Sequence, residues 1–224
     1  MVDVAAGAAT PEGPVDAAAY NEAIERSSAR GAYWSGSRLF IALSAMMLGA
    51  GVFAYFYLHS LNSAGLWRSP GQRPSDFISI PVLGLTLAGA ALYWWYTRLM
   101  LAGDVNSADW RVATGIAAGM FLLAAGLQFW GLTRTGFYPG SSGYASCYVA
   151  IMPVFAVYCL GTAYWLETLL ARSLMVRWVV AAEGPNRDSP ERVMFAGSAL
   201  GAKAMVVFVA LVSVVVFVLF SVIS

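Results

Sequence analysis

Five long apolar stretches constrain this sequence more than any other feature. They lie near residues 38–60, 77–101, 108–133, 143–171 and 195–223. At 1.5 Å per residue, each stretch is long enough as a helix to cross a hydrocarbon core of roughly 30 Å. Polar residues do not alternate with apolar ones inside them, which favours helices over the strands of a transmembrane barrel. We therefore predict an all-α, polytopic bundle of five membrane-spanning helices.

The segments between the stretches have the composition of loops. They read LNSAGLWRSPGQRPSDF, GDVNSAD, TRTGFYPGSSG and VRWVVAAEGPNRDSPER, in which Gly, Pro and polar residues favour turns. Residues 1–37 form a polar N-terminal arm in which Asp16 to Arg30 has helical composition and predicts a short surface helix. The first apolar run begins only near Leu39, without the basic start of a secretory signal, so no cleavage is expected. The predicted domains are the arm, 1–37, and the transmembrane bundle, 38–224.

Composition excludes a soluble domain. Hydrophobic residues make up 59% of the chain and charged residues 11%, whereas soluble proteins have roughly a quarter of their residues charged. The formal net charge of +1 gives no global field that would attract nucleic acid, so we predict no nucleic-acid partner.

The distribution of Lys and Arg predicts the orientation. If the N-terminus is cytoplasmic, ten of the thirteen cations fall on inner segments, and the three on outer segments are Arg68, Arg73 and Arg134. Cytoplasmic segments are enriched in Lys and Arg. We predict a cytoplasmic N-terminus and a periplasmic or extracellular C-terminus.

Few side chains offer chemistry within the spans. His59 is the only histidine, and one histidine cannot by itself hold a haem or copper centre. Cys147 and Cys159 are twelve residues apart on one helix, so they cannot pair with each other. Glu167 lies about one turn from the inner end of the fourth span, near Arg172, where a boundary carboxylate is favoured over a proton relay. We predict no catalytic residue, metal ligand or cofactor site in this chain.

Small residues predict faces for close helix packing. The pairs are Gly115 with Gly119, Gly197 with Gly201, and Gly49 with Gly51. Such spacings let helix backbones approach each other, although they also arise by chance in a chain rich in Ala and Gly. Together they indicate a packing subunit whose partners carry the chemistry.

Two parts of the sequence resemble a known family. LSAMMLGAGVFAYFYL, followed by AGLWRSPGQRP, is similar to the opening of the five-helix form of subunit III of haem-copper cytochrome c oxidases. GLQFWGLTRTGFYPGSSGYASCYVAIMPVFAVYCLGTAYWLETLLARS resembles the third and fourth helices of that form. Tyr144, Ser146 and Gly161 match family positions. The likeness covers about residues 38–175 and, more loosely, the last helix.

The chain also departs from the family. It has Ala45 and Trp130 where the family has glutamates, and Phe155 and Tyr158 where it has the two histidines of helix four, just after Pro153. The Trp-His-x-x-Asp stretch of the last helix is missing. A carboxylate can pass protons whereas Ala and Trp cannot, so we expect scaffolding without proton assistance.

The resemblance implies a non-catalytic accessory subunit of a haem-copper terminal oxidase of the aerobic respiratory chain, in the bacterial cytoplasmic membrane. Its partners would be the catalytic subunit I, which holds haem and copper, subunit II, and membrane lipids. Bound phospholipid would have its head groups near Arg98, Arg111 or Arg172, which serve equally well as topology determinants. The alternatives are the corresponding subunit of a nitric oxide reductase, and a stand-alone membrane carrier or assembly factor.

Overall fold

The structure of this chain is a computed structural model, which describes residues 14–61, 67–69, 71–102, 107–183 and 190–223. Within helices, the side chains of 14–27, 29, 30, 33, 107, 175–183 and 190–193 lie outside the described part. The helices are α1 (Pro14–Ser60), α2 (Asp76–Ala102), α3 (Ser107–Arg134), α4 (Gly143–Glu183) and α5 (Pro190–Phe217), and a π-helical turn, η1 (Val218–Val222), follows α5.

Each of the five helices contains an apolar segment long enough to span a membrane. The segments are Trp34–Ser60, Asp76–Ala102, Ala108–Arg134, Gly143–Leu174 and Met194–Val222. All regular structure in the described ranges is helical. The prediction of an all-α chain with five candidate membrane spans is therefore confirmed.

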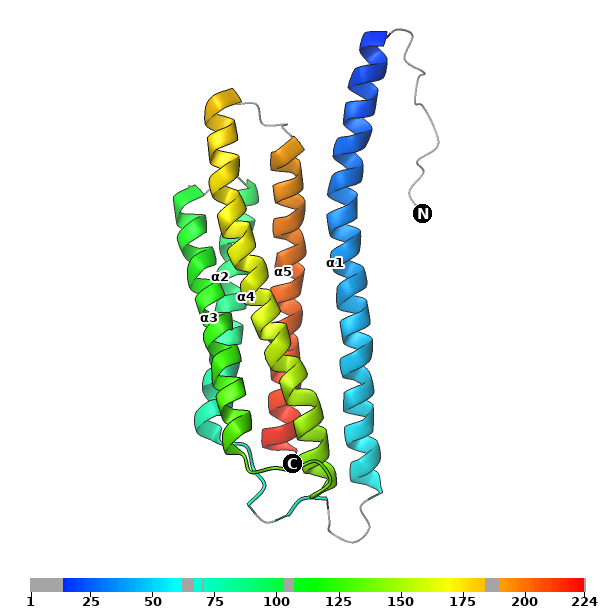
Figure 1. The fold of residues 1–224 in the computed structure, drawn as a ribbon, viewed down its shortest axis with the longest axis vertical. Helices are drawn as coiled ribbons and strands as arrows, with labels where there is room; N and C mark the ends of the chain where they lie inside the picture. The colour runs from blue at the N-terminus through cyan, green and yellow to red at the C-terminus, as the bar shows by residue number, and fades with distance from the viewer. Residues whose placement is uncertain (1–13, 62–66, 70, 103–106, 184–189, 224) are drawn as a thin grey trace.

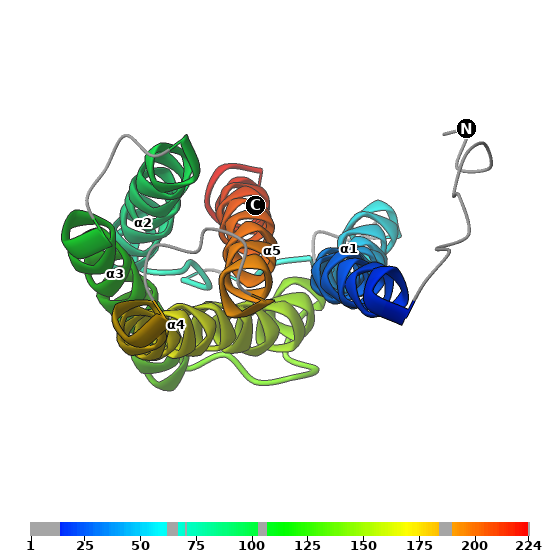
Figure 2. The same cartoon turned by 90° about the horizontal axis from the view of Figure 1, so that it is seen from above.

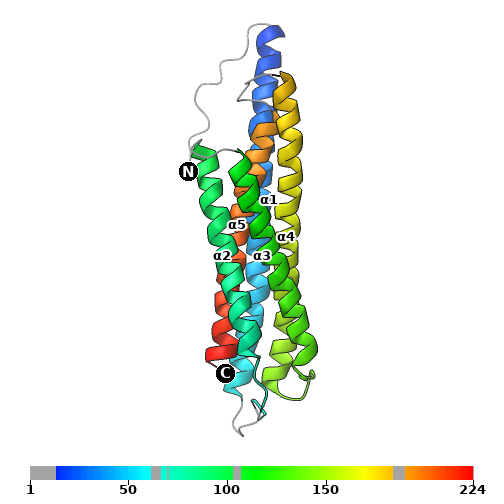
Figure 3. The ribbon, with the colours of Figure 1, turned by 90° about the vertical axis from the view of Figure 1, so that its left-hand side faces the viewer.

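Successive helices run antiparallel, so the connections alternate between the two ends of the bundle (Figure 1). The connections before α2 and before α4 lie at the end where α5 finishes, which we call the C-terminal end. α2 and α4 end, and α3 and α5 begin, at the opposite, N-terminal end. Seen along the bundle, α2, α3 and α4 form a row, α5 packs against α2 and α4, and α1 stands outermost beside α5 (Figure 2). The side view shows how long and narrow this arrangement is (Figure 3).

α1 differs from the predicted organisation. A short surface helix was expected within the arm, separate from the first span, but one continuous helix runs from Pro14 to Ser60. No proline lies between Arg30 and Arg38, and the glycines there weaken a helix without breaking it. Residue 37 is therefore not a break in the helix.

Two prolines lie inside helices, Pro81 in α2 and Pro153 in α4. Neither ends its helix. Transmembrane helices tolerate proline because neighbouring helices and local adjustments satisfy the backbone groups that it frees.

The core lies between α2, α3, α4 and α5. α3 contributes mainly alanines, including Ala117, Ala118, Ala124 and Ala125, all buried. On α2, a Cβ at Gly89 would lie 3.2 Å from the ring of Phe121, so a glycine there lets α2 and α3 approach. Lipid tails are as apolar as the helix side chains, so no hydrophobic effect drives membrane helices together. Close backbone approach of this kind stabilises their contact by van der Waals packing instead.

Candidate functional site

Six aromatic side chains form one cluster at the C-terminal end, which we call the aromatic cluster. Its members are Tyr55 of α1, Trp67 of the following loop, Phe137, Tyr144 and Tyr148 around the start of α4, and Phe220 of η1. The Tyr55 ring lies 5.0 Å from that of Trp67 and 5.4 Å from that of Phe220, both edge to face. Tyr148 contacts Phe220 in the same way at 5.3 Å. These are favourable geometries for aromatic pairs.

The cluster also donates hydrogen bonds to backbone carbonyls at the end of the last helix. The Tyr55 hydroxyl donates to the Leu219 carbonyl at 2.8 Å, and the Tyr144 hydroxyl donates to the Phe220 carbonyl at 2.9 Å. The last carbonyls of a helix have no partner within it, and the Ile223 N–H bonds to Val218 in the π-helical turn instead of to Leu219. Two tyrosines from α1 and α4 thus supply donors where α5 ends.

The loop after α1 caps the start of α4. The Tyr144 N–H donates to the Trp67 carbonyl at 3.0 Å, and the Ala145 N–H donates to the Ser142 hydroxyl at 3.0 Å. The first N–H groups of a helix need such acceptors, and serine is a preferred N-cap. A Cβ at Gly143 would lie 2.9 Å from the Trp67 ring, so glycine is required for this approach.

His59 lies at the rim of the aromatic cluster, exposed, with its ring 5.0 Å from that of Trp67. The Trp67 indole N–H is buried and has no hydrogen-bond acceptor among the described residues. Across the described residues, no group of three or more His, Cys, Asp or Glu side chains is placed to hold a metal ion. Cys147 and Cys159 are both free and buried, as their spacing predicts.

The charged residues singled out from the sequence are spread over the bundle. Arg111 ties α3 to α4, because its guanidinium donates to the Ser173 hydroxyl at 3.1 Å and to the Ser173 carbonyl at 3.0 Å. Arg98 and Arg172 are exposed, and Arg98 lies over the Trp94 ring. Glu167 is exposed on α4 and forms no ion pair with any described residue.

The predicted glycine faces differ from one another. A Cβ at Gly51 would lie 3.3 Å from Ile151 of α4, and one at Gly201 would collide with Ser37 of α1 and lie 3.3 Å from Trp165 of α4. Gly115 leaves 3.8 Å to Leu170. Gly49 and Gly119 have nothing within 4 Å of a built Cβ. Gly197 is buried in α5.

The positions where the chain departs from the oxidase subunit pattern are apolar or aromatic in different settings. Ala45 is exposed on α1 and Trp130 on α3. Phe155 is buried, and Tyr158 is half-buried with edge-to-face contacts to Phe40 and Phe208. Both positions thus take part in apolar packing on α4.

Sequence reasoning missed the convergence on Tyr55 and Tyr144 and the contact of the half-buried Lys203 with Trp94. The Lys203 ammonium lies 4.4 Å from the centroid of the Trp94 ring. Tyr and Trp are dense near the predicted ends of the first and fourth spans, as is typical of membrane interfaces, but this pattern does not indicate which rings meet.

The fold and these contacts define a class, a multi-pass membrane protein built as a five-helix bundle. No protein-family model and no curated protein matches the chain.

Proposed function

We propose that this chain is a non-catalytic accessory subunit of a haem-copper terminal oxidase, of the subunit III type. One observation carries the proposal. The two stretches that resemble the family contribute Tyr55, Trp67 and Tyr144, and these three side chains meet in the aromatic cluster. This contact between the two stretches that carry the resemblance supports the proposal.

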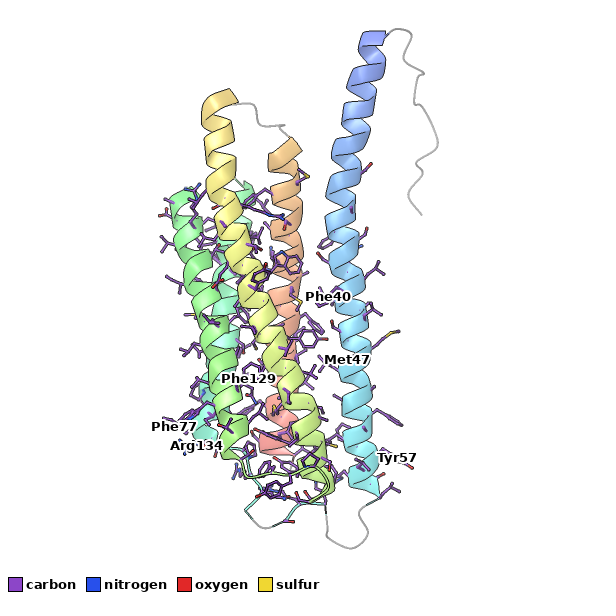
Figure 4. All side chains as sticks on the ribbon, viewed as in Figure 1. Phe40, Met47, Tyr57, Phe77, Phe129 and Arg134 are labelled. Carbon is purple, nitrogen blue, oxygen red and sulfur yellow. The ribbon has the colours of Figure 1, made fainter. Side chains whose placement is uncertain are left out.

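The cluster is suited to a scaffolding role. It fixes the ends of α1, α4 and α5 to one another through rings and through hydrogen bonds to backbone carbonyls. The remaining outer surface carries large apolar side chains, such as Leu39, Met46 and Phe53 on α1. Figure 4 shows such side chains on the outside of the bundle, with Tyr57 and Phe77 on opposite sides. A subunit of this type offers a rigid apolar surface to lipids and to the catalytic subunit.

In the proposed orientation, the N-terminal end of the bundle faces the bacterial cytoplasm. The support is the excess of cations on segments that connect at that end, ten against three. Arg26, Arg30, Arg177, Arg187 and Arg192 of this set have side chains outside the described part. Haem and copper belong to the partner subunits, and bound phospholipid fits the exposed Arg172, since Arg111 is bonded to Ser173.

Purification in mild detergent tests the proposal. The expected result is that the tagged chain elutes with a larger membrane protein and with haem absorbance in the same fraction. Elution of the chain alone, without haem absorbance, would contradict the proposal and favour a stand-alone carrier or assembly factor.

Glu167 provides a second test. If this carboxylate only marks the membrane boundary, Glu167→Gln leaves oxygen consumption and proton pumping by the assembled complex near wild type. Loss of proton pumping at unchanged assembly would show instead that the residue belongs to a proton path.

A further inference from the structure

A trough runs along the membrane-facing side of α5, between α1 and α2. It holds about 500 Å³ and is lined by Trp34 and Ile41 of α1, Trp94 of α2, and Lys203, Val207 and Leu211 of α5. A second hollow of about 460 Å³ lies alongside it and shares Trp94, Val207 and Leu211. α1 and α2 stand on either side of α5 and leave this face uncovered (Figure 2).

The floor of the trough continues as a stripe along α5. Val207, Leu211, Val214 and Val218 are all exposed, and Leu211 is 62% exposed. Their spacings of four, three and four residues place them on one side of a helix. A straight apolar stripe flanked by two helices has the shape that receives another transmembrane helix.

Two cations lie at the N-terminal part of the trough. The Lys203 ammonium is 4.4 Å and the Arg98 guanidinium carbon 5.8 Å from the centroid of the same Trp94 ring. No acidic side chain in the described part of the chain pairs with either cation. Ionisable groups within membranes generally pair with opposite charges, and among the described residues these two cations have no such partner.

The depth of Lys203 indicates what supplies that counter-charge. The apolar segment of α5 begins at Met194, next to Phe195, whose ring lies 5.4 Å from that of the buried Trp110. Lys203 follows Phe195 by eight residues, about 12 Å along the helix. Lipid phosphates lie outside the hydrocarbon core, and the Lys203 ammonium rests against Trp94 instead of extending to the head groups. A carboxylate on a protein helix can sit at this depth, whereas a lipid head group cannot without deforming the bilayer.

We propose that the trough docks a transmembrane helix of a partner protein that carries an Asp or Glu at the depth of Lys203. The carboxylate pairs with Lys203 and Arg98, and the apolar part of the helix packs along Val207 and Leu211. This inference deepens the proposed function, on which it rests, by assigning the face that meets a partner subunit.

Charge variants of the full-length chain, expressed in its own membrane, test the pairing. Lys203→Glu lowers the amount of co-purifying partner by about tenfold or more, because it places like charges in contact. Lys203→Arg retains the partner. Arg134→Glu is the matched control, since Arg134 is an exposed arginine over Trp130 at the opposite end. If Lys203→Glu fails to accumulate, Lys203→Leu, which keeps α5 apolar, takes its place.

A photoreactive benzophenone amino acid at Val207 identifies the occupant. The expected adduct is a membrane-spanning peptide that contains Asp or Glu, and its yield falls in the Lys203 variant. The same probe at Val112, which is exposed on α3, gives no such adduct. Replacing the identified acid by lysine, in combination with Lys203→Glu, restores the complex.

Three results would overturn the inference: wild-type levels of partner with both Lys203→Glu and Lys203→Leu, adducts at Val207 with lipid alone, or an adduct peptide without an acidic residue. Any of these, obtained in a complex that still contains haem, leaves the proposed function standing. An acidic helix captured from a complex without haem would instead support the docking face and contradict the oxidase assignment.

Discussion

The two halves of α1 are attached to the bundle in different ways. Among its described side chains, only Ser37, Ser44 and Tyr55 are buried. At the C-terminal end, Tyr55 is enclosed by rings and hydrogen-bonded to η1. In the N-terminal half, α1 touches α5 through small residues, with a hollow of about 590 Å³ on its α4 side and one of about 500 Å³ on its α2 side.

The difference indicates a division of roles along one helix. The C-terminal half closes on groups supplied by the chain itself, so it stabilises the subunit. The N-terminal half leaves apolar hollows and two cations without a carboxylate among the described residues. We infer that the C-terminal half of α1 serves folding and the N-terminal half serves assembly. Variants in each half can test this division.

The largest effect is expected from Trp67→Ala. The buried indole contacts Tyr55, His59 and Tyr144, and its removal leaves a cavity that lowers the free energy of unfolding by about 3 kcal/mol. Thermal unfolding in detergent measures this. Trp67→Phe keeps a ring and removes the N–H that lacks an acceptor, so it costs much less. Equal losses for the two variants would mean that the cluster does not depend on ring packing.

Gly201→Leu is expected to have the next largest effect. The new side chain meets Ser37 of α1 and the Trp165 ring of α4. The Ser37 hydroxyl can rotate, but its Cβ and the Trp165 ring both lie 3.3 Å from the built Cβ, so overpacking costs about 1–3 kcal/mol. The distance between spin labels on α1 and α5, or the yield of a disulfide engineered between them, measures how far the two helices move apart.

Gly119→Leu is the control for this variant, because nothing lies within 4 Å of a Cβ there. If neither variant changes the stability, the contact between α1 and α5 at Gly201, which we call the seam, can rearrange without a cost in free energy. Reduced assembly with unchanged stability of the isolated chain would assign the seam to the partner interface.

A smaller effect is expected from Tyr144→Phe. The ring contacts remain, but the buried Phe220 carbonyl loses the hydroxyl that bonds to it at 2.9 Å. Loss of a buried hydrogen bond from a side chain to a backbone carbonyl costs about 1 kcal/mol. Tyr57→Phe, at an exposed position on α1, is the control. A loss as large in the control would place the effect outside the cluster.

Sequence reasoning predicted the spans well and the contacts poorly. An apolar window of some twenty residues is a local property, so all five spans were predicted close to their observed positions. The arm was divided from the first span because its polarity changes near residue 37, yet polarity does not end a helix and only a breaker does.

The aromatic cluster depends on topology instead of local pattern. Tyr55 and Leu219 are 164 positions apart, and nothing in either stretch predicts that they meet. Arg111 was considered as a lipid contact because it lies at a membrane boundary. Its hydrogen bonds to Ser173 of α4 could not be anticipated without knowing how α3 and α4 align.

The smallest expected effect comes from the hydroxyl pair that joins α2 to α5, away from both halves of α1. The Thr86 hydroxyl donates to the Ser213 hydroxyl at 2.8 Å in the buried core. The Ser213 hydroxyl donates to the Ala210 carbonyl, and the single hydrogen of Thr86 can turn to the Val82 carbonyl of its own helix instead, so separating the helices would leave neither hydroxyl unpaired. A double-mutant cycle with Thr86→Ala and Ser213→Ala should therefore give a coupling of only about 0.6 kcal/mol. The Phe220 carbonyl is bonded by a side chain from another helix, so the Tyr144→Phe loss should exceed this coupling. If the two values are equal, ring packing and not hydrogen bonding attaches the C-terminal half of α1 to the bundle.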